Sequence, residues 1–400
     1  MDALQTLESR GFIQQCTNLE RVRGLLSEER VTFYVGFDPT ADSLHVGSLV
    51  PIMAMAWLQR MGHRVIAVVG GGTARVGDPS GKTELRKMLS GDAINANSVC
   101  LREQLSRYLT LDGEQGILID NADWLCELSY IDFLREIGSM FSVNRMLSAE
   151  AYRQRLERGL SFIEFNYQIL QAYDFLELFR RYDCTLQVGG DDQWGNMLAG
   201  TDLIRRCEQA EAHALTLPLI TTATGAKMGK TAQGAVWLSD TKLPVFDFFQ
   251  YWLNVDDRDV GRFLKMYTFL ELEEIERLEA LQGADIREAK RILAVETTTL
   301  CHGREAAEKA AAGAVAMVGS SAGEDLPTLV LEGDTGLLEV MKQAGFAKSN
   351  GEARRLVQGG AVRIDGEQMT DGTHEIPQAS LGEGVVLRVG KKRAVRLLPA

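Results

Sequence analysis

Alternating buried strands and helices near the start of the chain constrain its fold more than any other feature. Residues 31–35 (VTFYV) and 64–69 (RVIAVV) are β-branched and aromatic runs that predict buried strands, and the apolar spacing of residues 49–61 predicts a helix between them. A strand, a helix and a strand with short connections are typical of a βαβ unit, and therefore of a parallel sheet with right-handed crossovers. Both strands end in glycine-bearing turns, and ligands of such sheets bind beyond the carboxyl ends of the strands.

The same alternation continues along the chain before it gives way to other patterns. Residues up to about 29 are expected to be helical, further strands are predicted at 117–120, 186–188 and 215–220, and further helices at 131–141, 162–179 and 194–206. From Pro244 to about residue 316 the pattern is entirely helical. Gly, Ser and acidic residues over 317–334 indicate a linker. We therefore expect an α/β chain with a Rossmann-like parallel-sheet domain at 1–225, a lysine-bearing loop and helical domain at 226–316, a linker at 317–334 and a small α+β domain at 335–400.

Length and composition indicate a globular protein with several domains. Four hundred residues exceed one simple core, so two or three domains are expected. The sequence has no run of about 18 apolar residues, and its first residues lack the pattern of a secretion signal. Its six cysteines show no Cys-x-x-Cys spacing, which argues against a structural zinc site and against a disulfide framework. We expect a cytoplasmic protein with no metal site of its own.

Charge is unevenly distributed along the chain. The formal net charge is −12, so the protein repels polyanions except where basic residues gather locally. From Glu339 to the end, ten lysines and arginines stand against seven aspartates and glutamates, with Lys391, Lys392, Arg393 and Arg396 last. This basic segment is either a solvated chain end or a surface for nucleic acid.

Two distant segments have the chemistry to bind phosphate. The first is the turn around His45, where a strand feeds a helix and leaves backbone N–H groups and a positive dipole end facing the loop. The second is Lys-Met-Gly-Lys-Thr at 227–231, on a polar loop after the last strand of the predicted sheet. An imidazole and two ammonium groups over one triphosphate predict phosphoryl or nucleotidyl transfer, which depends on positioning and charge stabilisation. By itself, the second segment would be an exposed basic loop.

Two other phosphate-binding signatures are excluded. The run at residues 70–72 (GGG) does not match the dinucleotide fingerprint. Gly81-Lys82-Thr83 lacks the glycine five residues earlier that a P-loop requires. The phosphate chemistry of the site therefore depends on the His45 turn and the lysine-bearing loop.

Several longer motifs resemble one family. His45-Val46-Gly47-Ser48 is similar to the His-Ile-Gly-His signature of class I aminoacyl-tRNA synthetases, and residues 227–231 are similar to their Lys-Met-Ser-Lys-Ser signature. Within that class, residues 34–40 (YVGFDPT), 77–80 (GDPS), 170–174 (LQAYD) and 190–196 (GDDQWGN) resemble the bacterial tyrosyl-tRNA synthetases. The resemblance covers nearly the whole chain. It implies a catalytic Rossmann-like domain, a helical tRNA-binding domain and an S4-like RNA-binding domain.

The resemblance implies a pocket for L-tyrosine. Tyr34 and Asp174 match the positions that hydrogen-bond the substrate phenol, and such groups would stay unpaired if phenylalanine entered. The residues that match contacts to the ammonium and carboxylate groups of the substrate are Asp78, Tyr167, Gln171 and Gln193. Without the resemblance, Tyr34 would be read as a core aromatic residue and Asp174 as an acid on a helix surface.

The resemblance also implies an ATP site. The matching residues are Gly36, Asp38, Thr40, His45, Ser48, Gly190, Asp192 and Lys230. The catalytic group around the pyrophosphate is matched by His45, Lys82, Arg86, Lys227, Lys230 and Thr231. Mg²⁺ is expected to arrive with ATP, without a dedicated protein cage. Taken singly, each of these charged residues would be a solvated surface residue.

The implied reaction has two steps and ends on RNA. The tyrosine carboxylate attacks the α-phosphorus of ATP, which gives tyrosyl-adenylate and pyrophosphate, and the acyl group then passes to the 3′ end of tRNA(Tyr). No side chain acts as a nucleophile, since the protein orients the substrates and neutralises the charge on the leaving pyrophosphate. The family is homodimeric, which implies a homodimer here. The basic residues expected to contact RNA are Arg354, Arg355, Arg363, Lys391, Lys392 and Arg393.

Two positions depart from the signatures of the family. Ser48 stands where the second histidine of the first signature is found, so an imidazole contact to the nucleotide is replaced by at most one hydroxyl hydrogen bond. Gly229 stands where the second signature has serine, while Thr231 keeps a hydroxyl at its end. We expect altered ATP affinity rather than loss of function.

Three alternatives are weighed against this interpretation. A tryptophanyl relative is disfavoured because Tyr34 and Asp174 suit a phenol. A non-catalytic RNA-binding protein built on the same fold would be expected to lose His45, Lys82, Lys227 or Lys230, and all four are present. A small-molecule nucleotidyltransferase would have no use for a linker and a basic tail. Amino-acid-dependent pyrophosphate exchange separates the first alternative from the tyrosyl interpretation.

Overall fold

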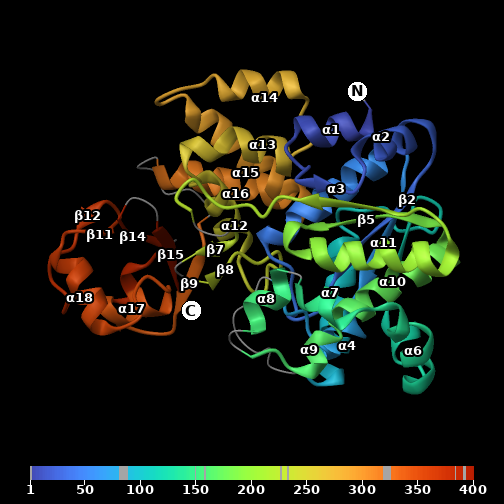
Figure 1. Ribbon diagram of the computed structural model, residues 1–400. Helices are drawn as coiled ribbons and strands as arrows, with labels where there is room; N and C mark the ends of the chain where they lie inside the picture. Colours follow the sequence, from blue (N-terminus) through green and yellow to red (C-terminus); the bar gives the residue numbers. More distant parts are fainter. Residues whose placement is uncertain are drawn as a thin grey trace. The chain divides into compact units, whose positions relative to one another are not determined.

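The computed structural model forms two compact units. It describes residues 2–80, 89–148, 150–156, 159–225, 228–231, 234–318, 326–382, 384–390 and 393–400. The larger unit comprises Met1–Pro244 and Tyr251–Cys301, and the smaller unit comprises Val245–Gln250 and His302–Ala400. Figure 1 labels the helices and strands of both units.

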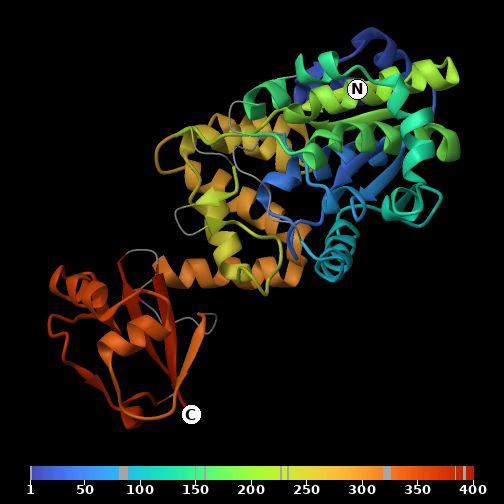
Figure 2. The same ribbon diagram turned by 60° about the horizontal axis from the view of Figure 1, so that its bottom comes forward.

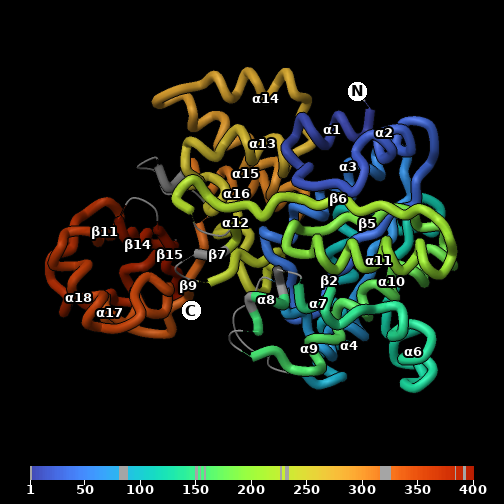
Figure 3. Tube along the Cα trace, viewed as in Figure 1, coloured from blue at the N-terminus to red at the C-terminus, as the bar shows by residue number. Residues whose placement is uncertain are grey.

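A six-stranded sheet in the order β1-β6-β5-β2-β3-β4 forms the centre of the larger unit. Strands β6, β5, β2, β3 and β4 run parallel to their neighbours, whereas β1 pairs antiparallel with β6 at the edge. Figure 3 shows β2, β5 and β6 side by side. The strands are β1 (Gln15–Cys16), β2 (Thr32–Phe37), β3 (Arg64–Val69), β4 (Gly116–Asp120), β5 (Cys184–Gly190) and β6 (His213–Leu217).

The order of the strands creates a switch point between β2 and β5. From β2 the chain moves outward through β3 to β4, and it then returns to the other side of β2 to form β5 and β6. Tyr34 of β2 lies opposite Gln187 of β5 in the parallel register. Open parallel sheets bind ligands beyond the carboxyl ends of their strands at such a point.

Helices cover both faces of this sheet. On one face, Ile66 and Val68 of β3 pack into one core with Phe175, Leu176 and Leu203 of α10 and α11, which Figure 1 shows side by side. Because side chains alternate along a strand, the other residues of β3 face the side on which α3 and α4 contact it. The helices up to this point are α1 (Ala3–Ser9), α2 (Leu19–Glu28), α3 (Leu49–Arg60), α4 (Gly91–Leu105), α5 (Ala122–Leu125), α6 (Tyr130–Glu136), α7 (Val143–Ser148), α8 (Glu150–Leu156), α9 (Phe162–Phe165), α10 (Tyr167–Tyr182) and α11 (Trp194–Glu208).

Helix α3 is the buried helix that follows the His45 turn. Its sequence LVPIMAMAWLQR is apolar on nearly all sides, and most of its residues are buried. Such a helix belongs inside the fold rather than at its surface. Pro51 lies in the first turn, where a missing N–H costs no helical hydrogen bond. A short 3₁₀ turn, Val46–Ser48, leads into the helix.

The chain beyond the sheet is helical, as expected. Trp252 of α12 is fully buried against Phe263 and Tyr267 of α13, with ring centroids 6.0 and 5.1 Å away. At the end of α13, the guanidinium of Arg10 donates to backbone carbonyls and lies 3.9 Å from the centre of the Trp57 ring. These helices are α12 (Val245–Leu253), α13 (Val260–Tyr267), α14 (Leu272–Glu279), α15 (Ile286–His302) and α16 (Arg304–Val318), after the small hairpin of β7 (Lys230–Thr231) and β8 (Gly234–Ala235).

The C-terminal part of the smaller unit, red in Figure 2, packs two helices against a five-stranded sheet in the order β12-β11-β14-β15-β9. Leu337, Val340, Val357, Leu387 and Leu397 are among its fully buried core residues. Its elements are β9 (Thr328–Leu331), β10 (Thr335–Gly336), α17 (Leu337–Gln343), α18 (Asn350–Gln358), β11 (Val362–Ile364), β12 (Glu367–Gln368), β13 (Glu375–Ile376), β14 (Val385–Val389) and β15 (Arg393–Pro399).

Three segments that the sequence does not predict as strands form strands through pairing. Residues 15–16 form the edge strand β1 rather than helix, because β6 offers an unpaired edge about 200 residues later in the chain. Residues 328–331, within the expected linker, form β9 and pair in parallel with β15. Residues 393–399, expected to be a basic chain end, form β15, which lies between β14 and β9 in the C-terminal sheet. Long-range pairing decides β1 and β9, whereas β15 also pairs with β14, its neighbour in the chain. Within the described residues, no helix has the length and apolar character needed to cross a membrane.

Candidate functional site

A cavity of about 270 Å³ opens at the carboxyl ends of β2, β3 and β5. It lies at the switch point of the sheet, where a ligand site was expected. Most of the site residues predicted in the larger unit line it, although they come from five separate stretches of the chain. They are Tyr34, Gly36, Asp38, Thr40, Ser48, Asp78, Tyr167, Gln171, Asp174, Gly190 and Gln193.

Tyr34 and Asp174 both lie buried in the wall of this cavity. Tyr34 is 2 % exposed, and among the described residues no group is within hydrogen-bond reach of its hydroxyl oxygen. Asp174 is 4 % exposed, and its carboxylate accepts from Asn121 Nδ2 and Trp124 Nε1, both at 2.8 Å. A buried hydroxyl without a partner is costly, so this end of the cavity suits a ligand that supplies a polar group.

Burial controls the ionisation of these two residues. Desolvation raises the pKa of Asp174 to about 8, although the hydrogen bonds from Asn121 and Trp124 oppose the shift by favouring the ionised form. Burial also raises the pKa of Tyr34 well above its ordinary value, with a further contribution from the Asp174 charge. Tyr34 is therefore a neutral hydroxyl throughout the physiological range.

Asp38, directly after β2, connects that strand to α10, the helix that carries the pocket residues Tyr167, Gln171 and Asp174. Its Oδ1 accepts from Thr73 Oγ1 at 2.7 Å, and its Oδ2 accepts from Tyr167 Oη at 2.9 Å. Thr73 in turn accepts a hydrogen bond from Asn121 Nδ2 at 3.0 Å. Asp38 and Asp174 are thus joined through Thr73 and Asn121, so the two carboxylates are held by one network.

Asn196 organises a second network around Asp78. Asp78 accepts from the backbone of Ser80 at 2.9 Å and from Gln193 Nε2 at 2.8 Å. Asn196 Nδ2 donates to Gln193 Oε1 and to Gln171 Oε1, both at 3.1 Å. The amide oxygens and the Asp78 carboxylate are thereby fixed along one side of the cavity.

The triple glycine after β3 is explained by the carboxylates that pack against it. A Cβ on Gly70 would lie 2.1 Å from Asp38 Oδ1, and a Cβ on Gly71 would lie 2.3 Å from Asp120 Oδ1. The backbone N–H of Gly72 donates to Asn121 Oδ1 at 2.8 Å. Any larger residue at Gly70 would displace the Asp38 carboxylate of the first network, and one at Gly71 would displace Asp120, which accepts from the Gly71 and Ala122 backbones.

The two signature segments meet in space. Val46 N donates to Val236 O at 2.9 Å, and Val236 N donates to Gly229 O at 2.8 Å, so the His45 turn, the β7–β8 hairpin and Gly229 form one backbone-bonded layer. A Cβ on Gly229 would lie 3.0 Å from the Gly47 nitrogen and 3.6 Å from His45 Nδ1. The expectation that these segments converge is confirmed for the described residues.

The backbone conformation at residue 229 explains why glycine stands there in place of the serine of the family signature. Its φ of +77° lies in the left-handed region, where a side chain is strained, and the nearest atom to an added Cβ is backbone. Gly47 is constrained as well, because a Cβ there would lie 2.8 Å from the imidazole of His45. The two glycines permit the close approach of the segments.

His45 and Asp192 lie away from the cavity lining. His45 is exposed, its backbone bridges Trp237, and its ring centroid is 6.3 Å from the Trp237 ring in an edge arrangement. Asp192 lines a neighbouring cavity of about 590 Å³ together with Asn196 and Trp194. The cavity at the switch point therefore holds only part of the predicted ATP and tyrosine sites. His45 and Asp192 belong to another part.

Several predicted residues are outside the description. Lys82, Arg86, Lys227, Lys391 and Lys392 lie outside the described residues. For Lys230 and Thr231 the structure gives only the backbone, as strand β7. In the smaller unit, Arg354 and Arg355 are exposed on α18, Arg363 is exposed on β11, and Arg393 of β15 donates to Phe346 O at 2.6 Å.

Four residues that sequence reasoning left unassigned complete the site: Thr73, Asn121, Trp124 and Asn196. Asn121 directly follows β4 and so stands at the same edge of the sheet as the other strand ends, which is a usable signal. Asn196 ends the motif 190–196. Trp124 carries no comparable signal in sequence.

Comparison with known proteins identifies the family. The model of the family "tRNA synthetases class I (W and Y)" matches residues 26–319, and that of the "Tyrosine--tRNA ligase SYY-like C-terminal domain" matches residues 317–396. A tyrosine–tRNA ligase of Nitrobacter winogradskyi is 52% identical over 411 residues, covering 100% of this chain and 99% of the relative. One of Clostridium tetani is 49% identical over 404 residues, covering 99% of each.

A solved structure agrees with these relatives. The C-terminally truncated mitochondrial tyrosyl-tRNA synthetase of Aspergillus nidulans superposes with a TM-score of 0.70 at 30% identity, covering 78% of this chain and 92% of that one. The family models, the relatives and the solved structure all agree with the geometry of the site, in which a cavity at the switch point lies beside two signature segments that converge. The chain belongs to the class I tRNA synthetase family, and within it to the tyrosine–tRNA ligases.

Proposed function

We propose that the cavity at the switch point holds L-tyrosine with its phenol between Tyr34 and Asp174. The observation that carries this assignment is the buried, unpartnered Tyr34 hydroxyl beside a carboxylate whose two oxygens are oriented by Asn121 and Trp124. A phenol accepts from the Tyr34 hydroxyl and donates to Asp174, so both buried groups become satisfied. An indole lacks an acceptor for Tyr34, and a phenyl ring satisfies neither group.

The polar side of the cavity receives the other end of the amino acid. Asp78, Tyr167 and Gln171 supply a carboxylate, a phenol and an amide oxygen for the three N–H donors of an ammonium group. Gln193, held by Asn196, faces the carboxylate of the substrate. Since the carboxylate must reach the α-phosphorus, fixing both ends of tyrosine orients the nucleophile.

ATP occupies the space between the strand ends and the two signatures. In this proposal Gly36, Asp38, Thr40, Ser48, Gly190 and Asp192 contact the nucleoside part, and His45 donates to a phosphate oxygen. Lys82, Arg86, Lys227, Lys230 and Thr231 surround the pyrophosphate, where their charges and hydroxyl offset the charge that develops as it leaves. Mg²⁺ enters bound to the phosphates of ATP rather than to a protein cage.

Chemistry then proceeds without a protein nucleophile. An oxygen of the tyrosine carboxylate forms a bond to the α-phosphorus, the bond to the bridging oxygen breaks, and pyrophosphate leaves. A ribose hydroxyl at the 3′ end of tRNA(Tyr) next attacks the tyrosyl carbonyl carbon and releases AMP. The residues proposed here lower the barrier by orientation and charge stabilisation.

The remaining parts of the chain are proposed to bind RNA. Residues 1–225 form the catalytic domain, 226–316 the lysine signature and helical tRNA-binding region, 317–334 the connection and 335–400 the S4-like domain. The exposed Arg354, Arg355 and Arg363, with Lys391, Lys392 and Arg393, supply cations for phosphates on a chain whose net charge is −12. The enzyme is proposed to act in the cytoplasm, where its six free cysteines suit a reducing environment.

We further propose that the enzyme is a homodimer. Segment α7–α9 exposes the apolar side chains of Val143, Leu156 and Phe162, which are 56%, 50% and 71% exposed, and Ile163 at 40%. Several exposed apolar side chains within one short stretch of the chain suit an association surface. Light scattering after gel filtration should give twice the chain mass. Phe162→Glu should give monomer, whereas Val315→Glu, an equally exposed apolar residue on α16, should leave the mass unchanged.

The decisive experiment is ATP–pyrophosphate exchange with each amino acid in turn. Tyrosine should support exchange and tryptophan and phenylalanine should not. Tyr34→Phe should raise the KM for tyrosine while leaving the KM for ATP unchanged, because only the phenol contact is lost. Exchange with tryptophan in place of tyrosine would overturn the proposal, and an unchanged KM in Tyr34→Phe would remove the phenol assignment.

A further inference from the structure

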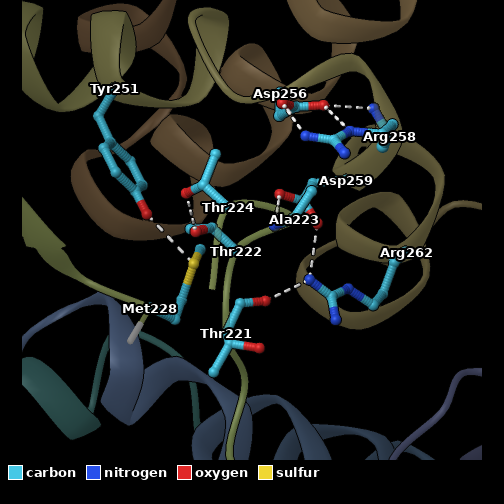
Figure 4. A network of polar contacts seen from close by, with 10 residues as sticks. All are labelled: Thr221, Thr222, Ala223, Thr224, Met228, Tyr251, Asp256, Arg258, Asp259 and Arg262. Carbon is cyan, nitrogen blue, oxygen red and sulfur yellow. Dashed lines mark hydrogen bonds and ion pairs between the residues drawn. The ribbon is translucent and has the colours of Figure 1, made fainter. Parts of the chain in front are cut away.

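The segment that leads into the lysine signature is tied to the helices that follow it. Figure 4 shows Thr221, Ala223 and Met228 of this segment beside Tyr251 of α12, Arg262 of α13 and Asp259, the residue just before α13. None of the contacts below is needed to complete the sheet or the tyrosine cavity.

The first attachment is a buried carboxylate. Asp259 is 3 % exposed, and its Oδ2 accepts from Ala223 N at 2.7 Å. Its Oδ1 pairs with Arg262 Nη2 at 2.7 Å, and the same nitrogen donates to Thr221 O. Two backbone groups of the segment, one N–H and one carbonyl, are thereby fixed by one ion pair.

The second attachment is Tyr251. Its hydroxyl donates to Met228 Sδ at 3.2 Å. Burial raises the pKa of Tyr251 to about 12, and a hydrogen bond from the Gly229 backbone opposes that rise. The hydroxyl therefore contacts two neighbouring residues of the signature, Met228 and Gly229. Met228 N also donates to Ile220 O at 2.9 Å, which links the two ends of the segment. This hydrogen bond connects the residues held by Asp259 and Arg262 with the residue held by Tyr251.

The opposite side of the signature packs on the His45 turn. Gly229 lies against Gly47, and its carbonyl is bonded to Val236. The signature is therefore held between the His45 turn on one side and α12 and α13 on the other. Its placement relative to His45 depends on both sides.

We propose that Asp259 and Arg262 are positioning residues for tyrosine activation, and that they act by fixing Thr221 and Ala223 at the start of the lysine-signature segment. The inference rests on the proposed role of the signature at the pyrophosphate. Charge stabilisation of a leaving group depends on where the cations stand, so loosening the start of the segment lowers kcat for activation. The tyrosine cavity shares none of these contacts, so the KM for tyrosine is unaffected.

The test uses the full-length enzyme in ATP–pyrophosphate exchange. Arg262→Ala should lower kcat by about tenfold or more, as small displacements of catalytic groups do, with the KM for tyrosine unchanged. Arg258→Ala is the matched control. Arg258 forms a bidentate pair with Asp256 in the same turn, at 2.8 and 2.9 Å, and neither residue makes a hydrogen bond or ion pair with the described residues of 221–228.

Two further variants separate positioning from folding. Arg262→Lys should recover most of kcat, because a single nitrogen makes both contacts and an ammonium group can replace it. Tyr251→Phe removes one hydroxyl at nearly constant volume and should lower kcat in the same direction as Arg262→Ala. An equal kcat for Arg262→Ala and Arg258→Ala, or a rise in the KM for tyrosine that matches the fall in kcat, would overturn the inference.

A last variant distinguishes this inference from the proposed function beneath it. Lys230→Ala removes a signature charge directly and should slow exchange by more than Arg262→Ala. If Lys230→Ala is slow and Arg262→Ala is normal, only the positioning role fails. If Lys230→Ala itself exchanges normally, the proposed role of the signature fails, and the inference fails with it.

Discussion

Gly229 and Gly47 stand so close that a Cβ on Gly229 would lie 3.0 Å from the Gly47 nitrogen. The two residues are 182 positions apart in sequence and belong to the two signature segments. Because neither residue has a side chain, the backbones approach closely enough for the His45 turn and the lysine signature to share one layer. This contact is the structural basis for treating the segments as one site.

Gly229→Ala is predicted to lower kcat for tyrosine activation by more than the same substitution at a glycine that has a similar φ but no close contact. The left-handed φ of +77° costs about 1 kcal/mol for a side chain, and the close contact with Gly47 adds to it. Pyrophosphate exchange and thermal unfolding measure the two effects. Gly11→Ala, in the turn after α1 and outside both signature segments, is the control, since its φ is +80° but an added Cβ meets nothing within 4 Å. Equal kcat in the two variants would show that the Gly47 contact is unimportant.

Trp124→Phe is predicted to weaken tyrosine binding. The indole N–H donates to Asp174 at 2.8 Å, and its loss leaves a buried carboxylate oxygen unsatisfied, which costs about 1–3 kcal/mol. The KM for tyrosine should rise about tenfold with the KM for ATP unchanged. Trp57→Phe removes an indole N–H that has no hydrogen-bond partner among the described residues, so it should leave both constants alone.

Thr73→Val is predicted to reduce kcat/KM for activation, whereas Thr73→Ser should retain it. The Thr73 hydroxyl donates to Asp38 and accepts from Asn121, so it joins the two carboxylates Asp38 and Asp174 within one network. Valine has the same shape without the hydroxyl, and serine keeps the hydroxyl. Steady-state exchange over both substrates is the measurement. A valine variant as active as the serine variant would contradict the role of this bridge.

The unliganded enzyme is predicted to lose stability as pH rises toward 8 because of Asp174. Its pKa is raised from 3.8 to about 8 by burial, so between these values the folded state holds a proton that the unfolded state releases. Stability from this group is complete at low pH and falls as the pH rises through that window. The melting temperature of Asp174→Asn should therefore fall less between pH 5 and 8 than that of the unchanged chain. Parallel slopes would show that Asp174 titrates normally.

Ending the chain after Val318 is predicted to preserve tyrosyl-adenylate formation and to reduce tRNA charging. Ending it at Asp334 should give a less soluble product, because β9 would remain without its partner β15 as an exposed strand. Pyrophosphate exchange, tRNA charging and light scattering of both truncated proteins provide the comparison. Normal charging by the shorter protein would exclude a role for the C-terminal domain in RNA binding.

The order of strands and helices could be predicted from sequence because it depends on local patterns. β3 and α3 are apolar over short, continuous runs, and their bounds lie within one residue of those predicted at 64–69 and 49–61. The signatures at 45–48 and 227–231 were also visible, since their residue types sit in fixed spacing. Local information of this kind gave the fold class, the family and most residues that line the cavity.

Only the tertiary structure decided which groups satisfy one another. Asp174 accepts hydrogen bonds from Trp124 and Asn121, which lie 50 and 53 residues earlier in the chain, and no pattern around Trp124 predicts that contact. Strands β1 and β9 likewise exist because a distant edge pairs with them. The physical reason is the same in each case: local preferences are written in neighbouring residues, whereas buried hydrogen bonds and strand partners depend on what folding brings close.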